Sequence, residues 1–216
     1  MPRAKQRTPE LREHVLQVAV ELLAADGVAG FTTRRVASQA ETSTPSVYEL
    51  FGDKAGLVRE VFFEGFRLLG QRLVARRPGA DARADLVDTL AELRSFIGEQ
   101  PVLAQVMFSR PFADFDPGPA EREAGRVVRE LLVARVQRAV DAGVLVGDPT
   151  DLAHVLLALT QGLAAQETAG WLGTSAASVE RRWTLAVTAL LDGTAGPRSR
   201  GRRVQARGPG DELSGR

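Results

Sequence analysis

The sequence predicts an all-α protein, with a small unit of three short helices near its N-terminal end and a larger helical body after it. Apolar residues recur every three or four positions along most of the chain, which is the period of an amphipathic helix. Proline and glycine break this pattern into helix-sized segments, and no stretch alternates apolar and polar residues as a strand does. A chain of 216 residues that is 44% hydrophobic and 25% charged can bury a core.

The composition excludes several kinds of site. Without cysteine the chain has no disulfide, thiolate metal site or cysteine nucleophile. It also lacks both the apolar run of a signal peptide and a stretch of about 18 apolar residues that would span a membrane. We therefore expect a cytoplasmic protein with no membrane partner, and we expect no metal and no cofactor.

Basic residues gather at the two ends of the chain. The first eight residues carry Arg3, Lys5 and Arg7 with no acid, and residues 194–216 carry six arginines against Asp211 and Glu212. That C-terminal segment therefore has a net charge of +4, while the whole chain has +1. We predict a basic arm over 1–8 and a basic disordered tail over 194–216, which either strengthen binding to a polyanion or are simply solvated.

The first helix starts after Thr8, which is suited to cap it, with Pro9 in its first turn and acidic Glu10 at its positive end. We expect it to end near Ala25, because Gly27 can adopt the left-handed conformation that terminates helices. Phe31 follows as a core anchor. One apolar face is formed by Leu11, Val15, Val18, Leu22 and Ala25.

A second and a third short helix follow, separated by a tight turn. Thr32 is a suitable cap for a helix that runs to about Ala40, and Ser43 or Thr44 is a suitable cap for the next. The third helix has Pro45 in its first turn and directs Val47, Leu50 and Phe51 inward.

Further helices make up the body. Asp53 can cap a fourth helix that stops before Pro78 and Gly79. Breaks at proline and glycine then leave five predicted helices, at about 82–99, 102–109, 120–142, 150–169 and 176–192.

The outer side of the third helix suggests DNA binding. Thr44, Pro45, Ser46 and Tyr48 lie in its N-terminal half, which in helix-turn-helix proteins enters the major groove. The segments from Phe31 to Ala37 (FTTRRVA) and from Thr44 to Lys54 (TPSVYELFGDK) resemble the TetR family over roughly residues 11–58.

The resemblance implies an all-helical homodimer that regulates transcription, usually as a repressor released from a palindromic operator by a small molecule. It implies a helix-turn-helix DNA-binding domain at 9–58 and a helical effector-binding and dimerisation domain at 59–193. The expected partners are double-stranded operator DNA, a small-molecule effector of unknown identity and a second copy of the chain.

The resemblance also implies the contacts with DNA. Tyr48 and Lys54 would bind phosphates, with Thr33 and Ser46 near the backbone, so binding should be salt-sensitive. Arg34 would reach a guanine edge, and Thr44 and Pro45 would meet base edges or a thymine methyl. The alternative for the two arginines at the start of the second helix is that they are merely solvated. The predicted DNA-binding residues are Thr33, Arg34, Arg35, Ser43, Thr44, Pro45, Ser46, Tyr48 and Lys54.

Two residues depart from the family pattern. Glu41 stands where a turn glycine is common, so either the turn differs or Glu41 adopts an unfavourable backbone at a cost of about 1 kcal/mol. Glu49 stands where a histidine or aromatic residue is frequent, and its carboxylate would repel phosphate unless it accepts from a cytosine amino group or points away.

Two further sets of candidates lie in the body. The first set, a ligand pocket bounded by helices four to eight, is suggested by the resemblance, although such side chains often only fill a core. The second set is apolar residues of the last two helices, which serve either the four-helix dimer interface that the resemblance implies or the core of the monomer. The pocket candidates are Phe62, Phe66, Phe96, Met107, Phe108, Phe112, Gln161 and Trp171. The interface candidates are Leu152, Val155, Leu156, Leu159, Trp183, Val187 and Leu190.

Two other functions compete with a sequence-specific regulator. A helical hydrolase is disfavoured because His14 and His154 are far apart in sequence and no zinc-protease, nucleophile-elbow or phosphate-loop motif occurs. We therefore expect no catalytic residue. A non-specific architectural DNA-binding protein would use the basic arm and tail, and random DNA would then compete as well as a selected site.

Overall fold

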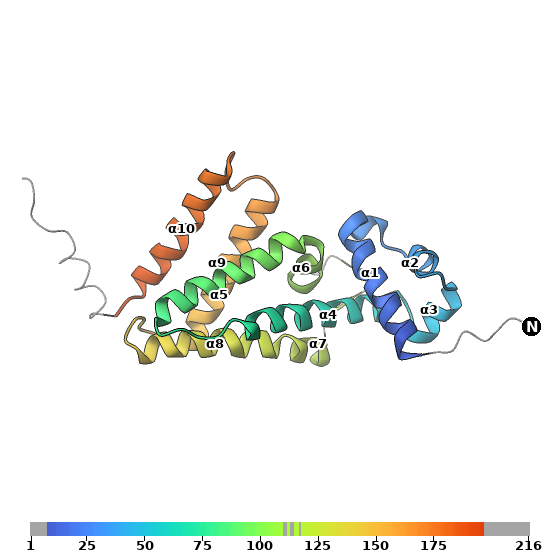
Figure 1. The fold of residues 1–216 in the computed structure, drawn as a ribbon, viewed down its shortest axis with the longest axis horizontal. Helices are drawn as coiled ribbons and strands as arrows, with labels where there is room; N and C mark the ends of the chain where they lie inside the picture. Colours follow the sequence, from blue (N-terminus) through green and yellow to red (C-terminus); the bar gives the residue numbers. More distant parts are fainter. Residues whose placement is uncertain (1–7, 110–111, 113–114, 117, 197–216) are drawn as a thin grey trace, which may run out of the picture. The chain divides into compact units, whose positions relative to one another are not determined.

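The computed structural model describes residues 8–109, 112, 115–116 and 118–196, and it confirms the all-α prediction. Within these residues there is no β-strand, and the one β-type pairing is an isolated bridge between Leu145 and Ala195. The helices, labelled in Figure 1, are α1 (Pro9–Gly30), α2 (Thr33–Gln39), α3 (Thr44–Phe51), α4 (Lys54–Ala75), α5 (Ala82–Glu99), α6 (Pro101–Phe108), α7 (Pro119–Ala124), α8 (Arg126–Asp141), α9 (Pro149–Thr168) and α10 (Ala176–Gly193).

The predicted helix starts agree with the structure because they depend on local capping. The Thr8 hydroxyl accepts a hydrogen bond from the amide of Leu11 at 3.2 Å, and Asp53 accepts from the amide of Gly56 at 2.7 Å. Each bond satisfies an amide that lacks a partner within its own helix. Gly27 has φ +67° and interrupts α1, which resumes as far as Gly30, five residues beyond the predicted end.

The helix predicted over 120–142 is instead two helices. Gly125 separates α7 from α8, and a Cβ at this position would lie 3.3 Å from the Phe66 ring. Glycine therefore allows a close approach between this turn and α4, but it contributes little to helix stability.

The described residues form two compact units. The first combines Met1–Ala75 with Ser95–Val128, and the second combines Arg76–Arg94 with Arg129–Arg216. The predicted domain boundary at residue 58 is a functional division that this grouping does not test. In the first unit α6 packs against α1 and α4, and α2 and α3 pack against each other. The most deeply buried large residues there include Leu22, Phe31, Leu57 and Leu69.

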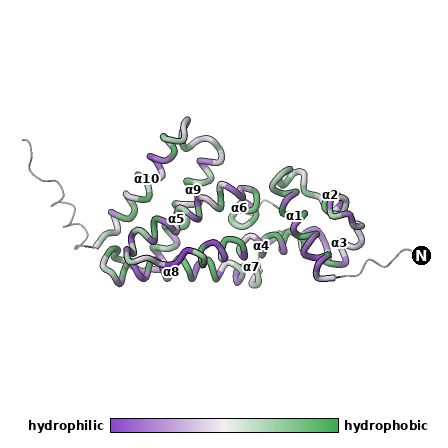
Figure 2. The backbone as a smooth tube through the Cα atoms, viewed as in Figure 1, coloured by the Kyte–Doolittle hydropathy of each residue, from purple (hydrophilic) through white to green (hydrophobic). Residues whose placement is uncertain are grey.

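The second unit is built from most of α5 and α8 together with α9 and α10. Leu86, Leu90, Leu132 and Leu156 are buried within it. Figure 2 shows hydrophobic and hydrophilic residues mixed along the helices, as expected of helices that bury one side. No helix among the described residues is long and apolar enough to cross a membrane.

The end of the second unit differs from the prediction of a disordered tail starting at 194. The amide of Val146 donates to the carbonyl of Thr194 at 2.8 Å, and the amide of Gly196 donates to the carbonyl of Val144 at 3.2 Å. Residues 194–196 are thus held against the segment between α8 and α9. The remainder of the predicted tail and residues 1–7 of the predicted arm lie outside the described residues.

Candidate nucleic-acid interface

The turn between α2 and α3 sets the position of the third helix. The amide of Thr42 donates to the carbonyl of Ala37 at 2.9 Å, and the amide of Glu41 donates to that of Ser38 at 3.2 Å. Glu41 has φ +50°, the one positive φ of a non-glycine residue in the described chain. The turn therefore keeps the left-handed geometry, and Glu41 adopts it at a cost of about 1 kcal/mol relative to glycine.

Ser43 is the N-cap of α3, one of the two residues the sequence offered for this role. Its hydroxyl accepts from the amide of Ser46 at 3.2 Å and lies 2.8 Å from the Ser46 hydroxyl oxygen. Val47 and Phe51 are buried, and this fixes the rotation of the helix. Pro45, Tyr48 and Glu49 are consequently exposed on its other side, while Thr44 and Ser46 are half-buried.

The face that α3 presents is therefore small and mostly uncharged. Tyr48 has 46% of its surface exposed and is its largest side chain. Serine, threonine and proline near the N-terminal end let a helix approach base edges closely, and a phenolic hydroxyl is suited to donate to a phosphate oxygen. Glu49 introduces one carboxylate into this face.

The residues predicted at the start of α2 have three different environments. Thr33 is buried, so its side chain is little available to a ligand. Arg34 is exposed, and its side chain makes no hydrogen bond or ion pair within the described part of the chain. Arg35, in contrast, pairs with the Asp26 carboxylate and donates to the carbonyl of Gly30 at 3.2 Å. Arg35 thus links α2 to α1, a contact that the sequence pattern did not reveal.

Lys54 begins α4 and is half-buried. Its ammonium lies 5.3 Å from the centroid of the Phe112 ring, which in turn packs edge-on against Phe31 at 5.7 Å. Phe112 was a pocket candidate, but here it supports the base of the three-helix unit. This cation–π contact with Phe112 keeps the Lys54 ammonium near the C-terminal end of α3.

The pocket candidates are divided between the two units. In the first unit Phe62 packs on Phe66 at 4.9 Å, and Phe66 packs on Phe108 at 5.8 Å. Phe115 joins them at 5.5 Å from Phe62, a contact the sequence did not suggest. Phe96 and Met107 are buried in the same unit. These contacts are those of a packed aromatic core.

The other two pocket candidates belong to the second unit. Trp171 is 82% exposed, so in the single chain it lines no enclosed pocket, and Gln161 is half-buried on α9. A groove in that unit instead lies between α5 and α10, and none of the eight pocket candidates lines it.

The interface candidates are also divided by burial. Leu156, Trp183 and Val187 are buried within the protomer, and the latter two line the groove between α5 and α10. Leu152, Leu159 and Leu190 are half-buried, and Val155 is 50% exposed. Leu185, which is 69% exposed on α10, was missed because its position is offset from the main apolar stripe. Its exposure could be recognised only after the buried side of α10 was known.

Glu121 and Glu167 are two of the carboxylates whose pKa values are lowered by their partners. For Glu121 on α7, burial acts to raise the pKa, but hydrogen bonds from backbone amides and the Arg59 guanidinium outweigh it and lower the pKa overall. On α9, the hydrogen bonds from Arg94 lower the pKa of Glu167. Both carboxylates are therefore charged at neutral pH and stabilise the packing of their helices.

Comparisons with known proteins match both parts of the chain. A family model described as bacterial regulatory proteins, tetR family, matches residues 15–61. A second model, described as tetracyclin repressor-like, C-terminal domain, matches residues 86–190. No curated protein matches the chain.

Solved structures with similar folds cover nearly the whole described chain. A protein of unknown function from Rhodococcus sp. RHA1 is 26% identical, with a TM-score of 0.75 over 89% of this chain and 99% of that one. A tetR-family bacterial regulatory protein from Rhodococcus RHA1 is 17% identical, with a TM-score of 0.66 over 88% and 99%. A third structure, concerned with control of antibiotic production by bacterial hormones, is 22% identical, with a TM-score of 0.65 over 88% and 100%.

Proposed function

Because this chain belongs to the TetR family of bacterial regulatory proteins and has the fold of its transcriptional regulators, we propose that it is a repressor that binds a palindromic operator as a homodimer and is released by a small molecule. The observation that carries the proposal is the α3 face. Buried Val47 and Phe51 anchor the helix, and Tyr48 remains exposed beside a run of small residues.

Two side chains are assigned the main roles on DNA. Arg34 is exposed and uncommitted within the described chain, so its guanidinium is available for a guanine edge, the base contact for which its geometry is best suited. Tyr48 would donate to a phosphate and fix register without reading sequence. Thr44 and Lys54 would add contacts from the N-terminal ends of α3 and α4.

The other predicted contacts have weaker support. Ser43 and Ser46 share a hydrogen bond in the capping arrangement of α3, and Arg35 is committed to Asp26. Thr33 is buried. We therefore assign these groups chiefly to holding α2 and α3 in place, with Pro45 making an apolar contact in the groove.

The homodimer is supported by apolar surface on the last two helices. Val155 on α9 and Leu185 on α10 are both at least half exposed, and a partner subunit packed against these two helices would bury them. A twofold dimer would repeat the reading helix and would match an operator with two half-sites.

Release by a ligand requires different ligand affinities in the DNA-bound and free states. Helix α4 is a suitable transmitter, because it starts at Lys54 beside the reading helix and contributes Phe62 and Phe66 to the aromatic core further along. Calorimetry that finds the same inducer affinity with and without operator would remove this coupling.

The test of DNA recognition is selection of sites from a random duplex library. We expect an enriched palindrome for the wild-type protein. Arg34→Ala should cost about 1–3 kcal/mol on the selected site and relax its sequence preference at one base position, whereas Tyr48→Ala should weaken binding to all sequences alike. Arg181→Ala on α10, also an exposed arginine, is the matched control and should bind like wild type.

The same experiment separates the competing functions. If random DNA competes as well as the enriched site, the protein is an architectural DNA-binding protein and the regulator proposal fails. A helical hydrolase is disfavoured because the sequence holds no zinc-protease, nucleophile-elbow or phosphate-loop motif. The family is also generally non-enzymatic.

A further inference from the structure

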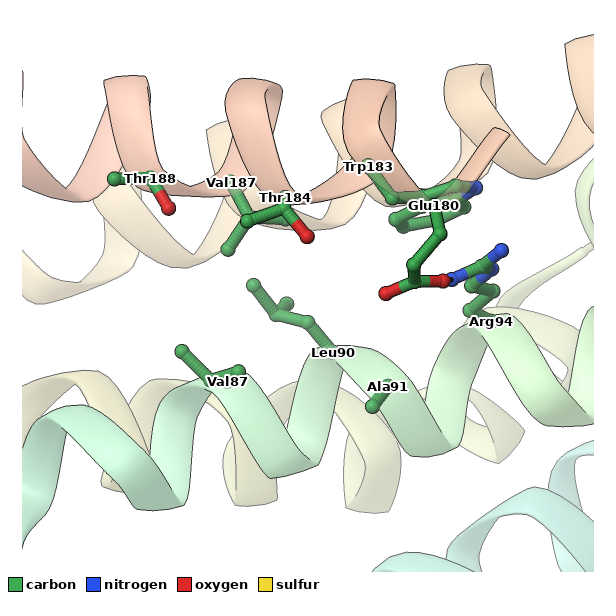
Figure 3. A pocket seen from close by; sticks show the side chains of 9 residues that line it. All are labelled: Val87, Leu90, Ala91, Arg94, Glu180, Trp183, Thr184, Val187 and Thr188. Carbon is green, nitrogen blue, oxygen red and sulfur yellow. Dashed lines mark hydrogen bonds and ion pairs between the residues drawn. The ribbon is translucent and has the colours of Figure 1, made fainter. Parts of the chain in front are cut away.

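A groove runs between α5 and α10 in the second unit (Figure 3). It contains about 460 Å³ of empty space, part of it open to solvent. Leu90, Trp183 and Val187 form its buried floor, while Val87 is 41% exposed at its rim. Apolar walls of this kind favour a molecule with an apolar body. Ala91 and the hydroxyl-bearing Thr184 and Thr188 complete the lining, apart from its charged end.

The charged end is built around Arg94. Its guanidinium donates to both carboxylate oxygens of Glu167, at 2.9 and 3.0 Å, and lies 4.6 Å from the ring centroid of Trp183. The indole N–H of Trp183 donates to Glu167 as well, at 2.7 Å. Arg94 is therefore neutralised by a bidentate partner that does not line the groove.

Glu180 adds a second carboxylate to the same arginine. One of its oxygens accepts from Arg94 at 2.7 Å. Figure 3 shows the other oxygen directed away from Arg94, on the side of the groove lined by Leu90. One guanidinium and two carboxylates leave this end with a net charge of −1, and the side chain of Glu180 is 65% exposed. An incoming cation can therefore pair with this second oxygen of Glu180 without breaking the bond between Glu180 and Arg94.

We propose that this groove binds an amphiphilic monocation, an amine with a slender apolar body, whose ammonium pairs with Glu180. Arg94 lies seven positions after Val87 on α5, so the groove is about 10 Å long at the rise of an α-helix. This length suits an unbranched chain of roughly eight carbons. The inference supplies a ligand class for the regulator proposed above, but binding is measured without DNA, so failure of either proposal leaves the other standing.

Three probes of equal length separate charge from hydrophobicity: octylammonium, 1-octanol and octanoate. Trp183 reports on the groove because it lines it, and Trp171→Phe removes the other, exposed tryptophan. Titration of this full-length variant by fluorescence, repeated by calorimetry, should give octylammonium about fivefold tighter binding than octanol, the size expected for a partly exposed ion pair. Octanoate should bind more weakly than octanol, and added salt should reduce the octylammonium preference.

Two variants locate the site. Glu180→Gln should bring octylammonium binding to within about twofold of octanol, while Glu130→Gln on the exposed side of α8 should keep the fivefold preference. Ala91→Phe should block all three probes by filling the groove, with circular dichroism to check the fold.

Three outcomes overturn the proposal. Tighter binding of octanoate would make Arg94 the anchor and the ligand an anion. A preference for octylammonium that survives Glu180→Gln would place the cation elsewhere. No binding of any probe to well-folded protein below the micellar concentration would mean that the groove is closed in solution, for instance by a second copy of the chain.

Discussion

Replacing Glu121 tests how the first unit is held together. This carboxylate on α7 is 4% exposed, accepts from the amide of Gly118 at 2.8 Å and pairs with Arg59 on α4. Glu121→Ala removes the cap of α7, worth about 1 kcal/mol, and leaves the Gly118 amide without this acceptor. It also removes an ion pair whose arginine is 49% exposed, which solvent screening limits to about 1 kcal/mol or less. The expected total loss is about 2 kcal/mol.

A matched series separates these two contributions. Glu121→Gln keeps an oxygen for the Gly118 amide and loses only the charge, so it should cost about 1 kcal/mol. Glu123→Ala, on the same short helix, removes an exposed pair with Arg126 and should cost no more than about 0.5 kcal/mol. Arg59→Ala should add little to Glu121→Ala, because the pair is already broken.

The assay is urea unfolding followed by circular dichroism. The free energies of unfolding of the variants are compared where the dependence on urea concentration has the same slope as in wild type. For a chain of this size about 2 kcal/mol corresponds to roughly 4–8 °C in melting temperature. If Glu121→Ala lies within about 0.5 kcal/mol of wild type, or if Glu121→Gln is as damaging as Glu121→Ala, the reasoning from burial and capping is refuted.

Three further predictions concern a turn, a tight contact and a pH dependence. Glu41→Gly should raise the free energy of unfolding by about 0.5–1 kcal/mol, because Glu41 has φ +50°; a loss of stability on urea unfolding would show that its side-chain interactions outweigh the strain. Gly56→Ala should destabilise by more than about 2 kcal/mol in the same assay, because a Cβ there would lie 1.9 Å from the carbonyl oxygen of Phe51, and wild-type stability would contradict this. Hydrogen bonds from Arg94 lower the pKa of Glu167 below its ordinary value, so its stabilising contribution is complete above the unfolded-state pKa and is lost as the pH falls through the lower folded pKa. The melting temperatures of wild type and Glu167→Gln should therefore converge as the pH is lowered. A difference in melting temperature that stays constant with pH would show that ionised Glu167 does not stabilise the fold.

Local sequence determined most of the helices and the design of the three-helix unit. Thr8, Ser43 and Asp53 are caps in the structure because capping involves only the next few residues along the chain. The buried side of α3 followed from the spacing of Val47 and Phe51 for the same reason. Gly125 shows the limit, since the sequence did not predict the break between α7 and α8, and the nearness of Phe66 to Gly125 is a tertiary contact.

Only the tertiary structure decided which candidate side chains are available and which are already used. Arg34 and Arg35 are adjacent, chemically identical and both exposed, yet Arg34 has no side-chain partner among the described residues whereas Arg35 pairs with Asp26 on α1. Trp183 was a candidate for the dimer interface and Trp171 for the ligand pocket. In the structure Trp183 lines a groove, and Trp171 is 82% exposed. Periodicity specifies which side of a helix is buried, whereas the partner of a charge or ring depends on residues distant in sequence that packing brings within a few ångströms.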